Sequence, residues 1–205
     1  QTAEYIMQVK NDGNGEDKVE LGVVSTQPGW VVTFEYTNLE VDRIIVGPRT
    51  SKTVAIKVRT PYEAEAGAFP TDLVLRDAGG NDNHVTVMTK VTQIYDIDLK
   101  CSQVHQVGTP GGFITYPMVI ENLGNGHDTV ELQVTSMPDG WNYNFKDLND
   151  QQITSIDLDY GSKIDIRLNV WVAEDQMETN VQVVARAQSV FEPSQQDQIQ
   201  LAAEI

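Results

Sequence analysis

The sequence has few cysteines, few basic residues and no long apolar run. Its 205 residues include one cysteine, Cys101, and only 14 Lys and Arg against 30 Asp and Glu. A single cysteine excludes an internal disulfide, so the core must be held by packing alone. No apolar run approaches the ~18 residues of a membrane-spanning helix. The net charge of −16 disfavours phosphate backbones and anionic lipid. We therefore expect no binding to nucleic acid and no direct membrane insertion.

The chain also lacks the motifs of catalysis. It contains no Gly-x-Ser-x-Gly elbow, no phosphate-binding loop and no paired-histidine motif. Its histidines, His84, His105 and His127, are too far apart in sequence to suggest zinc. Cys101 has no activating neighbour and is typical of a small buried hydrophobe. We expect a protein that is not an enzyme and needs no cofactor. Asn-x-Ser/Thr is also absent, so no N-glycosylation is expected.

An internal repeat is the most informative feature of the sequence. The stretch Tyr5–Gly15, YIMQVKNDGNG, recurs as Tyr116–Gly126, YPMVIENLGNG, at an offset of 111 residues. A Gly-Trp pair and a following Phe recur at the same offset, which makes Trp30 and Phe34 the counterparts of Trp141 and Phe145. We expect these four aromatic residues to lie in the cores of the two copies.

The offset changes beyond a later turn. Ser51-Lys52 matches Ser162-Lys163, and the apolar residues that follow, Val54, Ile56 and Val58, then match Ile164, Ile166 and Leu168 at an offset of 110. This alignment predicts that the second copy has lost one residue near the turn. A repeat of this length is a whole domain rather than a turn of a solenoid.

Apolar residues alternate along each copy, as at Tyr5, Met7 and Val9, and no sustained helical period appears. Clusters of Asn and Gly separate these runs about every ten residues and supply the backbone angles of tight turns. The pattern predicts an all-β chain of two tandem immunoglobulin-like antiparallel β-sandwiches. A barrel is the main structural alternative.

The repeat places the domains at residues 1–93 and 94–205, with almost no linker between them. So short a connection predicts a stiff tandem spacer. About twenty residues precede the Tyr116 motif in the second domain, but only four precede Tyr5. The first domain is therefore expected to lack its first strand. Tyr5, Met7 and Val9 then lie on an edge that could accept a strand from another molecule.

The repeated motifs resemble a known family. Asn11-Asp12-Gly13-Asn14-Gly15 with Pro28-Gly29-Trp30, and Asn122-Leu123-Gly124-Asn125-Gly126 with Gly140-Trp141, are similar to the NPCBM-associated alpha-galactosidase-type domain and its CARDB-like relatives. The first copy departs from the family pattern at Lys18, where the family has Thr. The resemblance implies an immunoglobulin-like fold without catalytic residues. It also implies a setting in tandem surface proteins of archaea and bacteria, or beside glycosidases.

Two loops are rich in oxygen donors. Asp12, Asn14 and Asp17 lie in the first Asn-Gly turn, and Asp77 and Asp82 flank Gly79-Gly80. Such residues can surround calcium, but the helical calcium-loop pattern fails, because Asp17 and Val23 stand where it needs Gly and Glu. A backbone turn explains the residues better, and calcium is the weaker hypothesis.

Three functions remain open from the sequence. The first is a non-catalytic structural or adhesive module at the cell surface or outside the cell, whose partners are flanking repeats or further copies of itself. The second is a filament or pilus subunit that assembles by a donated strand. The third is a carbohydrate-binding accessory domain of a glycosidase, for which Tyr36, Tyr62, Tyr143 and Trp171 could form an aromatic platform.

Overall fold

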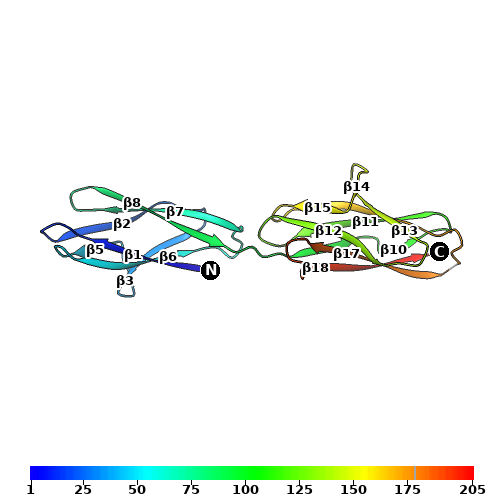
Figure 1. The fold of residues 1–205 in the computed structure, drawn as a ribbon, viewed down its shortest axis with the longest axis horizontal. Coiled ribbons are helices and arrows are strands. Elements are labelled where there is room, and N and C mark those ends of the chain that lie inside the picture. Colours follow the sequence, from blue (N-terminus) through cyan, green and yellow to red (C-terminus); the bar gives the residue numbers. More distant parts are fainter. Residues whose placement is uncertain (178) are drawn as a thin grey trace. The chain divides into compact units, whose positions relative to one another are not determined.

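The computed structural model describes residues 1–177 and 179–205, and regular structure in this part of the chain is entirely β (Figure 1). The chain divides into two compact units, Gln1–Thr92 and Gln93–Ile205. We call them the first and second sandwich. Their boundary lies one residue from the position that the repeat predicts.

The first sandwich is built from two antiparallel sheets. One has the order β1-β6-β3-β4 and the other the order β5-β2-β7-β8. The strands are β1 (Thr2–Lys10), β2 (Asp17–Ser25), β3 (Val31–Tyr36), β4 (Leu39–Glu40), β5 (Arg43–Val46), β6 (Ser51–Arg59), β7 (Gly67–Arg76) and β8 (Asp82–Val91).

The second sandwich repeats this arrangement and adds two strands. Its sheets have the orders β14-β13-β16-β11-β9 and β10-β18-β17-β12-β15. The strands are β9 (Ile97–Cys101), β10 (His105–Val107), β11 (Phe113–Asn122), β12 (Asp128–Ser136), β13 (Asn142–Lys146), β14 (Gln152–Ile153), β15 (Ser155–Leu158), β16 (Lys163–Trp171), β17 (Asn180–Ser189) and β18 (Gln196–Glu204). The prediction of two immunoglobulin-like β-sandwiches is confirmed, and a barrel is excluded because each unit has two separate sheets.

The extra strands lie along one side of the second sandwich. β9 pairs antiparallel with β11, and β10 pairs parallel with β18 of the opposite sheet. The segment that contains them therefore crosses from one sheet to the other and covers both edges. In the first sandwich the equivalent strands, β1 and β8, pair only with β6 and β7 among the described residues.

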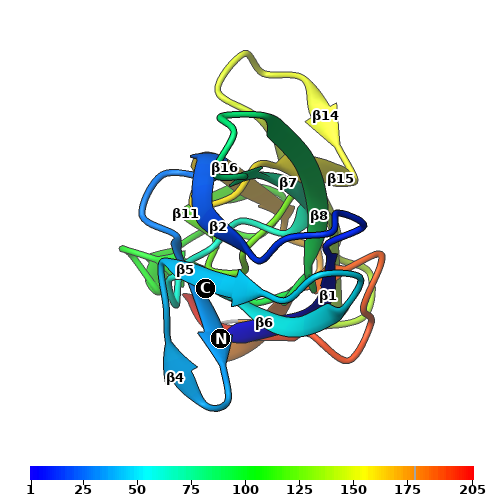
Figure 2. The same cartoon turned by 90° about the vertical axis from the view of Figure 1, so that its left-hand side faces the viewer.

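Strand pairing corrects the alignment of the two copies. Met7 lies opposite Val54, whereas Met118 lies opposite Ile166. Val54, Ile56 and Val58 therefore correspond to Ile166, Leu168 and Val170, so the second copy has gained one residue rather than lost one. The difference arises at the β4 and β14 hairpins, which project from their units in Figures 1 and 2. A two-residue turn, Thr37-Asn38, joins β3 to β4, and a longer loop joins β13 to β14.

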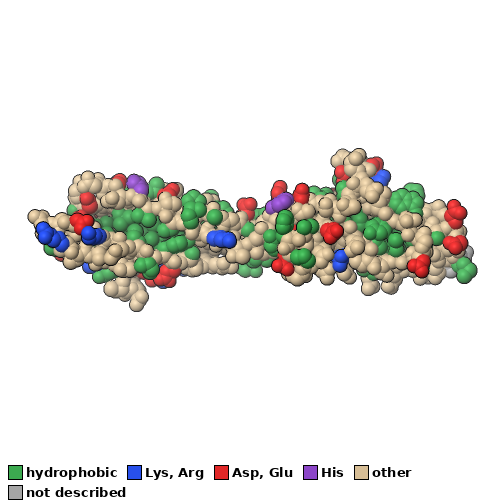
Figure 3. Space-filling view, in the orientation of Figure 1, with side chains coloured by type: hydrophobic (Ala, Val, Ile, Leu, Met, Phe, Trp, Pro, Cys, Tyr) green, Lys and Arg blue, Asp and Glu red, His purple; other side chains and the backbone are tan. Residues whose placement is uncertain are grey.

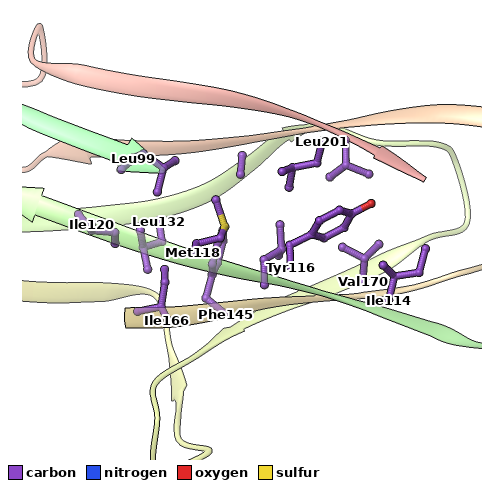
Figure 4. Close-up of a cluster of buried hydrophobic side chains, with 14 of the residues drawn as sticks. Leu99, Ile114, Tyr116, Met118, Ile120, Leu132, Phe145, Ile166, Val170 and Leu201 are labelled. Carbon is purple, nitrogen blue, oxygen red and sulfur yellow. The ribbon is translucent and has the colours of Figure 1, made fainter. Parts of the chain in front are cut away.

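The inward-facing residues of both sheets form one core in each sandwich. In the second core, Tyr116, Met118 and Ile120 of β11 lie among Leu99, Phe145 and Leu201 from other strands (Figure 4). Phe34, Trp141 and Phe145 are buried as expected. Trp30 is only partly buried; it packs against the edge of the first core and edge-on against Phe69, with ring centroids 5.4 Å apart.

Candidate functional site

The repeated tyrosine ties the two sheets of each sandwich together. The hydroxyl of Tyr5 donates to the carbonyl oxygen of Met88 at 2.8 Å, and that of Tyr116 donates to the equivalent carbonyl of Ala202 at 3.0 Å. Tyr116 is fully buried, and this burial raises its pKa to about 12. Tyr5 is partly exposed. The tyrosine that makes this contact is therefore buried in the second sandwich and partly exposed in the first.

The repeated asparagine holds the Asn-Gly turn. In the second sandwich the side-chain amide of Asn122 donates to the carbonyls of Gly126 and Leu158, and its oxygen accepts the N–H of Gly124. Asn11 makes the equivalent bonds to Gly15, Val46 and Gly13 in the first. The motif that carries the family resemblance is thus used by the backbone of the turn.

A groove of about 560 Å³ opens between β1 and β8 of the first sandwich. Met7, Val9, Val19, Leu75 and Val85 form its apolar floor, and we call this feature the β1–β8 groove. Figure 3 shows hydrophobic side chains gathered on this face of the first sandwich. Two of the three predicted edge residues, Met7 and Val9, line the groove, and Tyr5 lies on the same face of β1.

In the second sandwich β9 occupies the equivalent place. Its residues Ile97 and Leu99 are 6% and 4% exposed and belong to the core. Leu99 lies opposite Ile120, the counterpart of Val9. Because β9 covers this side, Met118 is 1% exposed while Met7 is 7% exposed. The two copies therefore show the same side of the fold with and without a covering strand.

The residues proposed for calcium already bind protein groups. Asp12 lies 2.6 Å from the Lys10 ammonium, and Asp17 accepts the N–H of Ala78 at 3.0 Å. Asp77 accepts the backbone and side-chain N–H groups of Asn81, and Asp82 forms a two-point ion pair with Arg76. These contacts lower the pKa of Asp77 and of Asp82, chiefly through the hydrogen bonds from Asn81 and Arg76.

Asn14, the remaining residue of the calcium set, is exposed in its turn. Within the described residues, no group of three or more His, Cys, Asp or Glu side chains is placed to hold a metal ion. Calcium binding stays a prediction. The three histidines are also separate: His84 lies on β8, His105 on β10, and His127 is 3.4 Å from Asp159.

A second concave surface lies on the outward face of β11, β13 and β16. Neighbouring residues on the three strands form two rows across the sheet. Phe113 and Asn142 flank Trp171 in one row, and Thr115 and Asn144 flank Asn169 in the other. The rings of Phe113 and Trp171 are 6.5 Å apart, and Thr115 donates to Asn169 at 2.8 Å. A hollow of about 340 Å³ is bounded further along by Lys146, Asp150 and Arg167. We call this surface the aromatic face.

Of the four aromatic candidates from the sequence, only Trp171 belongs to the aromatic face. Tyr143 packs edge-on against Phe145, with ring centroids 5.9 Å apart, and Tyr36 lies 4.7 Å from the Lys52 ammonium in the first sandwich. Tyr62 is fully exposed in the loop after β6. The structure adds Phe113, whose position opposite Trp171 follows from strand register and could not be read from sequence spacing.

Two buried groups are peculiar to the second sandwich. The Asp128 carboxylate is fully buried; its Oδ1 accepts the hydroxyl of Ser189, and its Oδ2 has no hydrogen-bond partner. Burial raises the pKa of Asp128. Cys101, at the end of β9, is partly buried against the core, and burial likewise raises the pKa of its thiol. Burial disfavours the thiolate, as expected for a structural cysteine.

No helix that is long and apolar enough to cross a membrane occurs in the described part of the chain. No protein-family model matches the sequence, and no curated protein sequence matches it.

Solved structures resemble the chain only distantly. A family 123 glycoside hydrolase from Clostridium perfringens is 7% identical over 53% of this chain, with a TM-score of 0.39; the match spans 27% of that enzyme. The CupB2 chaperone of Pseudomonas aeruginosa is 10% identical over 97% of this chain and 91% of its own, with a TM-score of 0.32. The fibronectin(III)-like modules of Clostridium thermocellum CbhA are 13% identical over 98% and 94%, with a TM-score of 0.29.

Proposed function

We propose that the chain is a non-catalytic structural module of an extracellular or cell-surface protein. One observation carries this proposal: the residues that recur between the copies are used in the same contacts within each sandwich. Tyr5 and Tyr116 join the sheets, and Asn11 and Asn122 hold the turns. The residues shared by the two copies therefore have structural roles. Catalytic residues would instead lie close together in an open cavity.

The net charge and the packed cores support the same proposal. A charge of −16 keeps such modules soluble and apart from polyanions, and each core is filled by side chains of both sheets. The partners that we propose are flanking domains of the same kind or further copies of the chain.

The location of the protein tests the proposal. Antibodies raised against residues 1–205 are expected to label intact, unpermeabilised cells of the organism that makes the protein, or to detect the protein in its medium. A cytoplasmic protein of the same cells serves as the control for lysis. Labelling that appears only after permeabilisation would contradict an extracellular module.

A second candidate function, carbohydrate binding, rests on the aromatic face. Sugar rings stack on aromatic side chains, and amide groups such as those of Asn144 and Asn169 can bind their hydroxyls. The Phe113 and Trp171 rings and this polar row lie on one outward face, and Trp171 is 38% exposed. Arg167 donates to Asp150 at 3.0 Å and helps to fix the charged end of the hollow.

Affinity electrophoresis against a panel of soluble polysaccharides distinguishes the two candidates. If the aromatic face binds sugar, one or more polysaccharides retard the chain, and Trp171→Ala removes the retardation. Tyr62→Ala is the matched control, because Tyr62 is an exposed aromatic residue outside this face. Retardation that both variants retain, or the absence of retardation across the panel, would exclude sugar binding at the aromatic face.

A further inference from the structure

The two sandwiches differ at the aromatic face. By strand register, Arg59 and Thr2 of the first sandwich occupy the places of Trp171 and Phe113. The first sandwich builds the equivalent sheet without the two rings, so the fold does not require them. In the second sandwich they stay 38% and 66% exposed. The ring pair is therefore an addition to the surface of one copy.

The loop that closes the hollow also differs between the copies. Two residues, Thr37-Asn38, join β3 to β4, whereas residues 147–151 join β13 to β14. The Asp147 carboxylate accepts the backbone N–H of Gln151 at 2.8 Å, and Asp150 has a positive φ of 62°. Asp tolerates this conformation better than most residues do. The loop thereby holds Asp150 at the rim of the hollow.

Asp150 supplies the carboxylate of the hollow. Its Oδ1 accepts a hydrogen bond from Arg167 at 3.0 Å and lies 3.8 Å from the Lys146 ammonium. The Asp150 side chain is 70% exposed, so a ligand in the hollow can reach it. A carboxylate held in this way accepts hydrogen bonds from sugar hydroxyls and repels a ligand that is itself acidic.

The amides of the middle row are oriented by their neighbours. The Thr115 hydroxyl donates to Asn169 Oδ1 at 2.8 Å, and Asn169 Nδ2 donates to Asn144 Oδ1 at 3.3 Å. Both amide oxygens therefore already accept a hydrogen bond, and the remaining N–H groups can donate to a ligand. A hydroxyl group both donates and accepts, so a sugar can use these amides and Asp150 together.

The charges along this face balance. Lys146 and Arg167 are opposed by Asp150 and by Asp165, which lies two residues from Arg167 on the same side of β16. The whole chain carries a net charge of −16, and its field repels anions. Uncharged sugars are therefore favoured over uronic acids and sulfated sugars.

The length of the hollow indicates the size of the ligand. It extends over three rows of the sheet, from Trp171 through Asn169 to Arg167. Neighbouring rows on one face are about 6.6 Å apart along a strand, so three rows cover about 13 Å. This distance exceeds one pyranose ring. One ring can stack on the aromatic pair while linked rings reach the amides and Asp150.

Building on sugar binding as the second candidate function, we propose that the aromatic face binds a neutral oligosaccharide of several pyranose rings and that Asp150 excludes acidic sugars. Trp171 and Phe113 supply the stacking surface. Asp150 supplies the selection, because its carboxylate binds hydroxyls and keeps Lys146 and Arg167 from attracting a ligand carboxylate.

NMR titration of the isotope-labelled intact chain tests the class of sugar. The side-chain N–H groups of Trp171, Asn144 and Asn169 report binding. Neutral probes are cellohexaose, mannohexaose and xylohexaose, and acidic probes are hexagalacturonate and hexamannuronate. At least one neutral hexasaccharide is expected to bind at least about tenfold more tightly than its monosaccharide and than either acidic probe. Trp171→Ala should weaken this binding at least about tenfold. Arg59→Ala, at the equivalent position of the first sandwich, is the matched control and should leave it unchanged.

Asp150→Asn tests the selecting residue. Asn also tolerates a positive φ, so the loop is expected to keep its conformation, which circular dichroism and the amide spectrum check. The variant should bind the neutral hexasaccharide about tenfold more weakly, because hydrogen bonds to a carboxylate are lost. Acidic probes should bind at least about threefold more tightly, because Lys146 and Arg167 lose their anionic partner. Asp12→Asn removes an exposed, ion-paired carboxylate from the first sandwich and should change neither affinity.

The other outcomes separate the class of sugar from sugar binding itself. Equal binding of neutral and acidic probes, or binding of acidic probes alone, would overturn the neutral class and leave sugar binding at the aromatic face standing. Polysaccharide retardation that depends on Trp171, without binding of any neutral hexasaccharide, would do the same. Unchanged selectivity in Asp150→Asn would overturn its role. Binding no tighter than that of a monosaccharide would overturn the proposed length. No binding in either experiment would refute sugar binding at this face altogether.

Discussion

The Tyr116 hydroxyl lies 3.0 Å from the carbonyl oxygen of Ala202 and joins the two sheets of the second sandwich from a fully buried side chain. Its counterpart, Tyr5, makes a 2.8 Å bond to Met88 and a further 2.9 Å contact with the Thr89 hydroxyl at a partly exposed position. The two bonds have nearly the same geometry and differ in their access to water.

Tyr116→Phe is expected to lower the free energy of unfolding of the second sandwich by about 1 kcal/mol, because the partly buried Ala202 carbonyl loses the hydrogen bond from a fully buried side chain. Tyr5→Phe is expected to cost the first sandwich less than half as much, since water can replace the hydroxyl. Chemical denaturation followed by hydrogen-exchange mass spectrometry resolves the two sandwiches. A larger loss for Tyr5→Phe would contradict this comparison.

Asn122→Ala is expected to lower the free energy of unfolding of the second sandwich by about 2–4 kcal/mol, because it leaves several buried backbone groups without partners. Asn11→Ala removes equivalent bonds at a more exposed turn and is expected to cost about 1–2 kcal/mol. Denaturant titration of both variants makes the measurement. Losses below about 0.5 kcal/mol would mean that the asparagines do not hold their turns.

Asp128 is expected to make the second sandwich more stable in mild acid relative to an Asp128→Asn variant. Burial raises its folded pKa above the unfolded value, although the Ser189 hydroxyl, the Thr129 N–H and the charge of His127 oppose the shift. The folded state therefore favours the protonated acid. This contribution is present below the unfolded pKa and is lost as pH rises through the folded pKa.

The measurement compares unfolding free energies of the two proteins from about pH 3 to about pH 7. The stability of Asp128→Asn relative to the original protein should increase with pH and then level off. Using the difference removes the effect of the other carboxyl groups, which titrate in both proteins. A difference that does not change with pH would mean that Asp128 titrates normally in the fold.

Cys101 is expected to react with iodoacetamide at least about tenfold more slowly than free cysteine, because burial raises the pKa of its thiol and restricts access. Denaturant should restore the rate. Mass spectrometry of the alkylated chain follows the reaction, and since Cys101 lies on β9, the rate also reports detachment of that strand. A rate equal to that of free cysteine would show that β9 does not cover the core in solution.

The sequence was sufficient to predict the two sandwiches, because turn and core residues recur at a fixed offset. It could not align the residues of β6 correctly with the equivalent residues of β16. An apolar alternation has a period of two, so Ile164, Ile166 and Leu168 match Val54, Ile56 and Val58 as well as their true counterparts do. Only pairing across the sheet, with Met7 opposite Val54 and Met118 opposite Ile166, decides the register.

The site residues were anticipated unevenly. Met7 and Val9, which the sequence analysis places on one edge of the first domain, line a groove beside β1, and strand acceptance there stays a prediction. The aromatic face was missed except for Trp171, because Phe113 approaches it across a strand pair separated by more than fifty residues. The burial of Asp128 was missed as well: its counterpart Asp17 is less buried and binds Ala78, so the repeat gave no sign of the difference.

The parallel pairing of β10 with β18 has a mechanical consequence. These two strands lie near opposite ends of the chain segment that forms the second sandwich, and His105–Val107 align with Ala202–Glu204. Tension applied to the ends of this unit would pull the two strands along their length, so their hydrogen bonds would carry the load together in shear. The first sandwich has no such pair among its described strands.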